Sequence, residues 1–139
     1  MPHSAFRMAA FALAALAVAA SAARAETGRD VTIDSRAFVA VSAPGAPAIE
    51  LRLARVVKDE RCPARVLCAW AGPSVIEVEA RSAGAGARLT LSSKGGTAAT
   101  FEGWRIALQY LDPQPLEPDE FEKLKPLEAY TARLSVSHP

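Results

Sequence analysis

The sequence is poor in histidine, a side chain on which many hydrolytic and metal-dependent sites rely. Only His3 and His138 are histidines, and His138 is the last residue but one. Ser-His-Asp and Cys-His sites need an imidazole that the surrounding structure holds in place. Chain ends are usually mobile. We therefore expect no nucleophilic site of these types.

Cysteine is also scarce, since Cys62 and Cys68 are the only two. Structural zinc takes about four Cys or His ligands at characteristic spacings. Redox dithiol motifs have a shorter spacing than the five residues that separate these cysteines. Calcium takes about six to eight oxygen ligands, and the neighbouring carboxylates of Asp59 and Glu60 supply too few. We therefore predict no metal site and no cofactor.

No stretch of the chain is rich in basic residues. The 16 Lys and Arg residues nearly balance the 15 Asp and Glu residues, and the net charge changes from +1 to −1 when Arg7 and Arg24 are removed. Nucleic acids and anionic membranes attract clusters of Lys and Arg. We therefore expect neither of them as a partner.

The first 25 residues have the pattern of an export signal. Arg7 precedes an apolar run over residues 8–20, and residues 21–25 end in a small-x-small cleavage pattern. The run is shorter than the ~20 apolar residues of a membrane-spanning helix. The alternative to an export signal is a buried helix. We expect a signal peptide over residues 1–25. We expect residues 26–139 to form one domain without a membrane span, a monomer that is periplasmic or secreted.

Beyond the signal, apolar residues alternate with polar ones, and turns rich in glycine and proline separate the segments. This pattern is typical of short strands with one buried face. Arg55 interrupts one alternation, which predicts a bulge, and residues 31–41 are expected to form one strand region. About seven segments predict an all-β fold, an antiparallel immunoglobulin-like β-sandwich. The residues expected to point inward include Ile49, Leu51, Leu53, Ser74, Ile76, Val78, Ala80, Ile106, Leu108, Tyr110, Tyr130, Ala132, Leu134 and Val136.

A short segment near the C-terminus resembles fibronectin type III domains. Leu124, Pro126 and Tyr130 have the L-x-P-x-x-x-Y spacing that precedes a late strand in those domains. The tyrosine hydroxyl there forms a hydrogen bond with nearby backbone and stabilises a corner between the sheets. The resemblance implies the same role for Tyr130.

The segment from Asp59 to Gly72 contains both cysteines and one of the two tryptophans. An even number of cysteines in an exported protein predicts a disulfide between Cys62 and Cys68. This bond removes the thiolates and with them nucleophilic and metal-binding chemistry. The result is a small rigid ring, which can bind a partner at a low ordering cost.

Two interpretations of this ring remain. In the first, Arg61, Arg65 and Trp70 form a binding surface, or Trp70 forms an aromatic platform with Trp104. In the second, which we favour, Val66 and Leu67 fold inward, the arginines form ion pairs, and Trp70 packs against the sulfurs in the core.

The same segment resembles a motif in small, exported, largely uncharacterised bacterial proteins, D-[ES]-R-C-P-x-x-V-x-C-x-W-A-G. This chain matches it with Asp59, Glu60, Arg61, Cys62, Pro63, Val66, Cys68, Trp70, Ala71 and Gly72. The resemblance implies export and a compact β domain. It implies no catalytic residues.

Three hypotheses for the function follow. The leading one is a non-enzymatic exported domain that binds a protein or a cell-envelope component. The alternative is an inhibitor of a secreted hydrolase that acts through Arg65 in the Cys62–Cys68 loop. The third is a carboxylate-dependent hydrolase, which needs two carboxyl groups about 5–10 Å apart, for which the candidates are Asp59, Glu77, Glu79 and Glu102.

Overall fold

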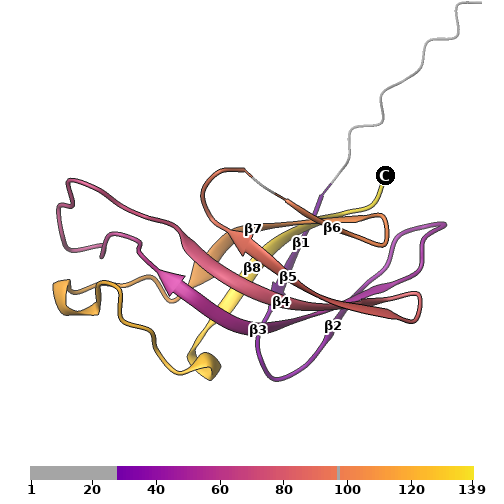
Figure 1. Cartoon of the computed structure of the whole chain (residues 1–139), viewed down its shortest axis with the longest axis horizontal. Helices are drawn as coiled ribbons and strands as arrows, with labels where there is room; N and C mark the ends of the chain where they lie inside the picture. The colour runs from indigo at the N-terminus through magenta and orange to yellow at the C-terminus, as the bar shows by residue number, and fades with distance from the viewer. Residues whose placement is uncertain (1–27, 97) are drawn as a thin grey trace, which may run out of the picture.

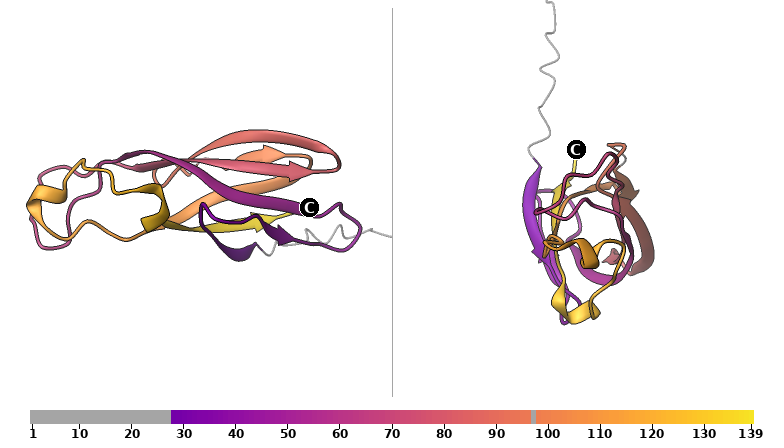
Figure 2. Two further views of the ribbon diagram at one scale, coloured as in Figure 1. Left: turned by 90° about the horizontal axis from the view of Figure 1, so that it is seen from below. Right: turned by 90° about the vertical axis from the view of Figure 1, so that its left-hand side faces the viewer.

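The computed structural model is an antiparallel β-sandwich, as the alternating pattern predicts. It describes residues 28–96 and 98–139, so the predicted signal peptide lies outside the described residues. Two four-stranded sheets face each other (Figures 1 and 2), one in the order β1-β8-β7-β6 and the other in the order β2-β3-β4-β5. The strands are β1 (Arg29–Ile33), β2 (Val39–Val41), β3 (Ile49–Asp59), β4 (Ser74–Ser82), β5 (Ala85–Ser92), β6 (Ala99–Phe101), β7 (Trp104–Asp112) and β8 (Thr131–Ser137).

The strand order is that of two successive meanders. Apart from β1 and β8, every pair of hydrogen-bonded neighbours is consecutive in the chain. Immunoglobulin domains connect their strands as Greek keys instead. The antiparallel sandwich is therefore confirmed, but its connections differ from those of an immunoglobulin domain.

The segment over residues 31–41 forms two strands in different sheets rather than one strand region. The carboxylate of Asp34 accepts a hydrogen bond from the backbone N–H of Arg36 at 2.8 Å. Aspartate side chains stabilise turns in this way. The turn directs the chain from β1 to β2 and adds a strand to the seven that were predicted.

The inward faces follow the predicted alternation, with one correction. Register shifts in β3 expose Arg55 and bury Val56, which confirms the bulge. In β7 a register shift between Leu108 and Tyr110 buries Leu111, so the expectation that Tyr110 points inward is wrong. A bulge reverses the in–out order beyond it.

Two aromatic side chains in the core also form hydrogen bonds to backbone. Trp104 is 1% exposed, and its indole N–H donates to the carbonyl of Pro47 at 3.0 Å. Tyr130 is equally buried, and its hydroxyl accepts a hydrogen bond from the backbone N–H of Lys125 at 3.0 Å. The bond to Tyr130 is the one that the L-x-P-x-x-x-Y spacing implied.

Two long connections extend beyond the sheets at one end of the sandwich. The connection between β3 and β4 (residues 60–73) is called the cysteine loop here, and that between β7 and β8 (residues 113–130) the β7–β8 loop. The second contains two short 3₁₀ turns, Pro118–Glu120 and Leu127–Ala129. Both loops lie side by side at the left of Figure 1 and of the left view in Figure 2. We call this part the loop end.

In the part of the chain that the structure describes, no helix has the length and apolar character needed to cross a membrane.

Candidate functional site

The cysteine loop is closed at its base and bridged near its middle. Cys62 and Cys68 form the predicted disulfide, with their Cα atoms 5.9 Å apart. At the base, the backbone N–H of Glu60 donates to Pro73 at 3.0 Å, and that of Gly72 donates to Glu60 at 2.8 Å. These bonds hold the ring at a set position relative to β3 and β4.

Removal of the disulfide should lower the free energy of unfolding by about 2.4 kcal/mol, because a closed ring of this size restricts the unfolded chain by roughly that amount. Urea unfolding of the Cys62→Ser/Cys68→Ser variant measures this change. The wild-type protein under reducing conditions should unfold at the same urea concentration as the variant. An unchanged free energy of unfolding in both would contradict a stabilising role for the disulfide.

The two loops are joined to each other through their backbones. The N–H groups of Ala64 and Arg65 donate to the carbonyls of Pro115 at 2.9 Å and Leu116 at 3.1 Å. Arg65 also forms an ion pair with Glu117. The loop end is therefore one unit rather than two independent loops.

Arg61 lies between the loops and is satisfied by the protein itself. Its guanidinium donates to both carboxylate oxygens of Asp59 at 2.7 Å. It also donates to the carbonyls of Leu111 at 2.5 Å and Pro113 at 2.9 Å. The side chains of Arg61 and Asp59 are only 13% and 2% exposed.

The same contacts keep Arg61 charged. Burial acts to lower the pKa of Arg61, but the hydrogen bonds and the charge of Asp59 outweigh burial and raise the pKa above its ordinary value. Because four of its five N–H groups donate to the protein and its side chain is largely covered, Arg61 holds the loops together. It is not part of the surface that a partner would meet.

The β7–β8 loop is stabilised around a carboxylate of its own. Glu120 accepts hydrogen bonds from Lys125 at 2.5 Å and from the backbone N–H groups of Leu116 at 2.7 Å and Glu117 at 2.9 Å. The bond from Lys125 and then the backbone bonds lower the pKa of Glu120 to about 2. This carboxylate therefore stays ionised across the physiological range of pH.

Trp70 and Leu67 lie on the surface, so the expectation that they fold into the core is wrong. Trp70 is 62% exposed and Leu67 is fully exposed. The cysteine loop extends beyond the ends of the two sheets (Figure 2), so these side chains lie outside the core between the sheets. The indole lies over Gly72, because a Cβ atom there would come within 2.8 Å of Trp70 Cη2. An aromatic platform of Trp70 with Trp104 is excluded, since Trp104 is buried.

Most exposed large apolar residues of the described chain belong to the two loops of the loop end. Five large hydrophobic residues are exposed in this part of the chain, namely Val57, Leu67, Trp70, Leu116 and Leu124. Val57 lies near the end of β3, and the others lie on the two loops. We call the four loop residues the apolar tip. Arg65, which is 68% exposed, is the charged candidate beside them.

The candidate carboxylates of a hydrolase lie on three different parts of the fold, with Glu77 and Glu79 together on the outward face of β4. Asp59, Glu77 and Glu79 each pair with an arginine at 2.7 Å or less. The hydrogen bond from its arginine lowers the pKa of Glu79, which keeps this group ionised. Glu102 is exposed in the turn between β6 and β7.

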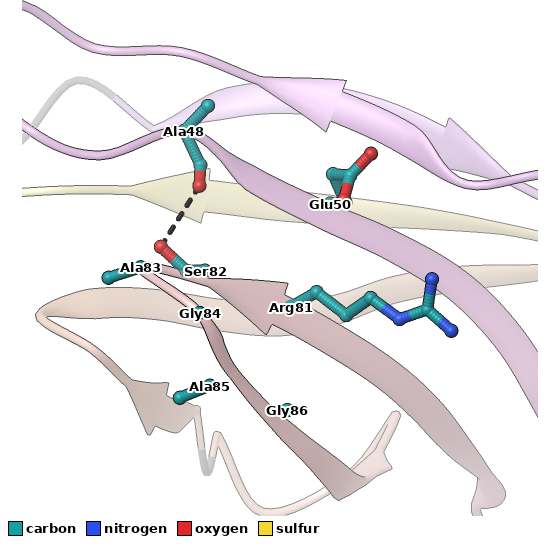
Figure 3. A pocket seen from close by; sticks show the side chains of 8 residues that line it. All are labelled: Ala48, Glu50, Arg81, Ser82, Ala83, Gly84, Ala85 and Gly86. Atoms are coloured by element: carbon teal, nitrogen blue, oxygen red, sulfur yellow. Dashed lines mark hydrogen bonds between the residues drawn. The ribbon is translucent and has the colours of Figure 1, made fainter.

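A cavity of about 400 Å³ lies at the other end of the sandwich, lined by Ala48, Glu50 and residues 81–86. Five of these eight residues are alanine or glycine. Figure 3 shows the guanidinium of Arg81 directed away from Ser82 and the turn. This guanidinium lies instead 3.9 Å from the ring centroid of Phe38. None of the four candidate carboxylates lines the cavity.

His138 packs against the sandwich although it is nearly the last residue. Its ring lies edge-on to Trp104 with the centroids 5.1 Å apart, and it covers Gly103. This near-terminal histidine therefore has a packing partner in Trp104. Within residues 28–96 and 98–139 no three His, Cys, Asp or Glu side chains are grouped as metal ligands would be.

Comparisons with known proteins give no direct indication of function. No protein-family model matches this chain, and neither a curated protein nor a solved structure is found to be similar to it.

Proposed function

We propose that this chain is a non-enzymatic, exported β-sandwich domain whose loop end binds a protein partner. The observation that carries the proposal is that exposed Leu67, Trp70, Leu116 and Leu124 all belong to two loops that backbone hydrogen bonds join. Exposed apolar side chains that lie together mark interaction sites. Tryptophan is especially frequent among the residues that dominate binding energy.

The way in which the tip is supported favours binding. The disulfide, the backbone bonds between the loops and the buried pair of Arg61 with Asp59 hold the loops in one conformation. A preformed surface loses little conformational entropy when a partner binds. Arg65 and Glu117 lie beside the tip and would form part of its polar rim.

The sequence supports a periplasmic or extracellular location for this binding. The first 25 residues have the pattern of an export signal. The disulfide is suited to an oxidising compartment. The resemblance of the cysteine segment to small exported bacterial proteins supports the same location, and a partner there would be a protein or another component of the cell envelope.

A capture experiment tests the proposal. Residues 26–139, immobilised in the oxidised form, are exposed to an envelope extract alongside Trp70→Ala and Leu116→Ala variants. We expect a partner that binds at micromolar concentration or below and whose retention falls at least about tenfold in each variant. A Glu50→Ala variant, exposed at the opposite end, should retain the partner like wild type. A partner that all variants retain equally, or none at micromolar concentration, would disprove the proposal.

A further inference from the structure

The most exposed part of the apolar tip is a continuous segment of the cysteine loop. Leu67, Cys68, Ala69 and Trp70 are all exposed, and they precede the half-buried Ala71. Leu67 is the most exposed large hydrophobic residue of the described chain, and it lies inside the disulfide ring. A single large side chain thus protrudes from a closed loop.

The backbone of this segment is also unpaired. No N–H or carbonyl group of Leu67, Cys68, Ala69 or Trp70 forms a hydrogen bond with any residue that the structure describes. The preceding residues differ, since Ala64 and Arg65 donate to the β7–β8 loop. Free main-chain groups on an exposed segment are what a partner pairs with when it binds a peptide along its backbone.

Accepting the proposed binding role of the loop end, we infer that its partner is an endopeptidase with an apolar primary pocket. Leu67 enters that pocket, and the backbone around it pairs with the walls of the substrate cleft. Such a cleft recognises one protruding side chain together with the main chain beside it, which are the two features that the loop presents. A primary pocket with a carboxylate at its bottom selects Arg or Lys, whereas an apolar pocket accepts a large hydrophobic residue.

In this geometry Leu67, rather than Arg65, is the residue that would enter an enzyme pocket. The side chain of Arg65 is paired with Glu117, and its backbone N–H is bonded to Leu116. Entry of Arg65 into a cleft would break both contacts. Leu67 needs no such rearrangement, because neither its side chain nor its backbone is held by described residues.

The ring favours a segment that stays bound in the cleft as an inhibitor over one that is cleaved and released as a substrate. The loop is held by the disulfide, by the base bonds of Glu60 and by the bridges to the β7–β8 loop. Binding in one conformation has a low ordering cost. The peptide bond between Leu67 and Cys68 lies within the ring, so both sides of it stay attached through the disulfide. We therefore expect simple occupation of the cleft without a covalent step.

Inhibition assays test this inference directly. The oxidised domain is added in excess to chymotrypsin and subtilisin, which have apolar primary pockets, and to trypsin, with chromogenic peptide substrates. We expect an inhibition constant in the micromolar range or below for at least one of the first two, and no inhibition of trypsin. Leu67→Asp should weaken inhibition at least about 100-fold, since it places a charge in an apolar pocket.

Two further variants make the assay specific. Leu67→Lys should transfer inhibition from the apolar-pocket enzymes to trypsin. Glu50→Ala, at the opposite end of the sandwich, should inhibit like wild type. Because Leu67 is exposed, thermal unfolding of its variants should match that of wild type, which excludes misfolding as the cause of a loss. Absence of inhibition at large excess, equal inhibition by Leu67→Asp, or rapid cleavage as an ordinary substrate would each overturn the inference.

The capture experiment separates this inference from the proposed function. If Leu67→Asp loses the captured partner while wild type inhibits neither apolar-pocket enzyme, the endopeptidase assignment is wrong and the binding role of the tip stands. If wild type captures no partner and inhibits neither enzyme, both are wrong.

Discussion

Replacement of Arg61 by alanine is expected to lower the free energy of unfolding by about 3–5 kcal/mol. The change leaves the carboxylate of Asp59 without its partner at a site where it is 2% exposed. An uncompensated charge in such a place is strongly destabilising. The carbonyls of Leu111 and Pro113 also lose their donor, so the β7–β8 loop should become more mobile.

Urea unfolding measures this loss, and hydrogen exchange of the β7–β8 loop shows its location. The matched control is Arg65→Ala, which removes an arginine of the same loop that is 68% exposed. Exposed ion pairs contribute up to about 1 kcal/mol, so the control should lose no more than that. Adding Asp59→Ala to Arg61→Ala should recover part of the loss, since it removes the stranded charge. Equal small losses for both arginines would contradict the role of Arg61 as the clamp between the loops.

The two tryptophans should differ by several kcal/mol in their contributions to stability. Trp104→Ala is expected to lower the free energy of unfolding by about 3–5 kcal/mol, because it leaves a large cavity in the core. The carbonyl of Pro47 loses the indole N–H at the same time. Trp70→Ala should change the free energy by no more than about 0.5 kcal/mol, since the side chain is 62% exposed.

Urea unfolding and tryptophan fluorescence together check this contrast. The Trp70→Ala variant retains Trp104 and should show the blue-shifted emission of a buried indole, which moves to longer wavelength on unfolding. Trp104→Ala retains Trp70 and should show emission typical of an indole in water. A loss above about 2 kcal/mol on replacement of Trp70 would mean that its ring packs in the core after all.

The strands themselves could be predicted because each depends on a local pattern. In β4 the alternation from Ser74 to Ala80 matches the buried face residue by residue. In β3 the misplaced Arg55 indicated the bulge for the same reason. Tyr110 was misplaced because nothing in the alternation of β7 marks where its register shifts.

The partition of strands between the sheets could not be predicted in the same way. Residues 31–41 read as one region, and only the turn at Asp34 shows that the chain changes sheet there. The meander order is likewise a matter of pairing between distant segments. Alternation reports which side of a strand is buried, but it carries no information about its neighbour.

For the candidate site, the sequence by itself determined the disulfide between Cys62 and Cys68, since only two cysteines are present in a chain with an export pattern. Tertiary structure alone decided which residues of the ring reach a partner. It covered Arg61 with the β7–β8 loop and left Leu67 and Trp70 exposed beyond the sheets. The physical reason is distance along the chain: burial of a loop residue depends on whether a segment some 50 residues away folds over it, and no local pattern records that.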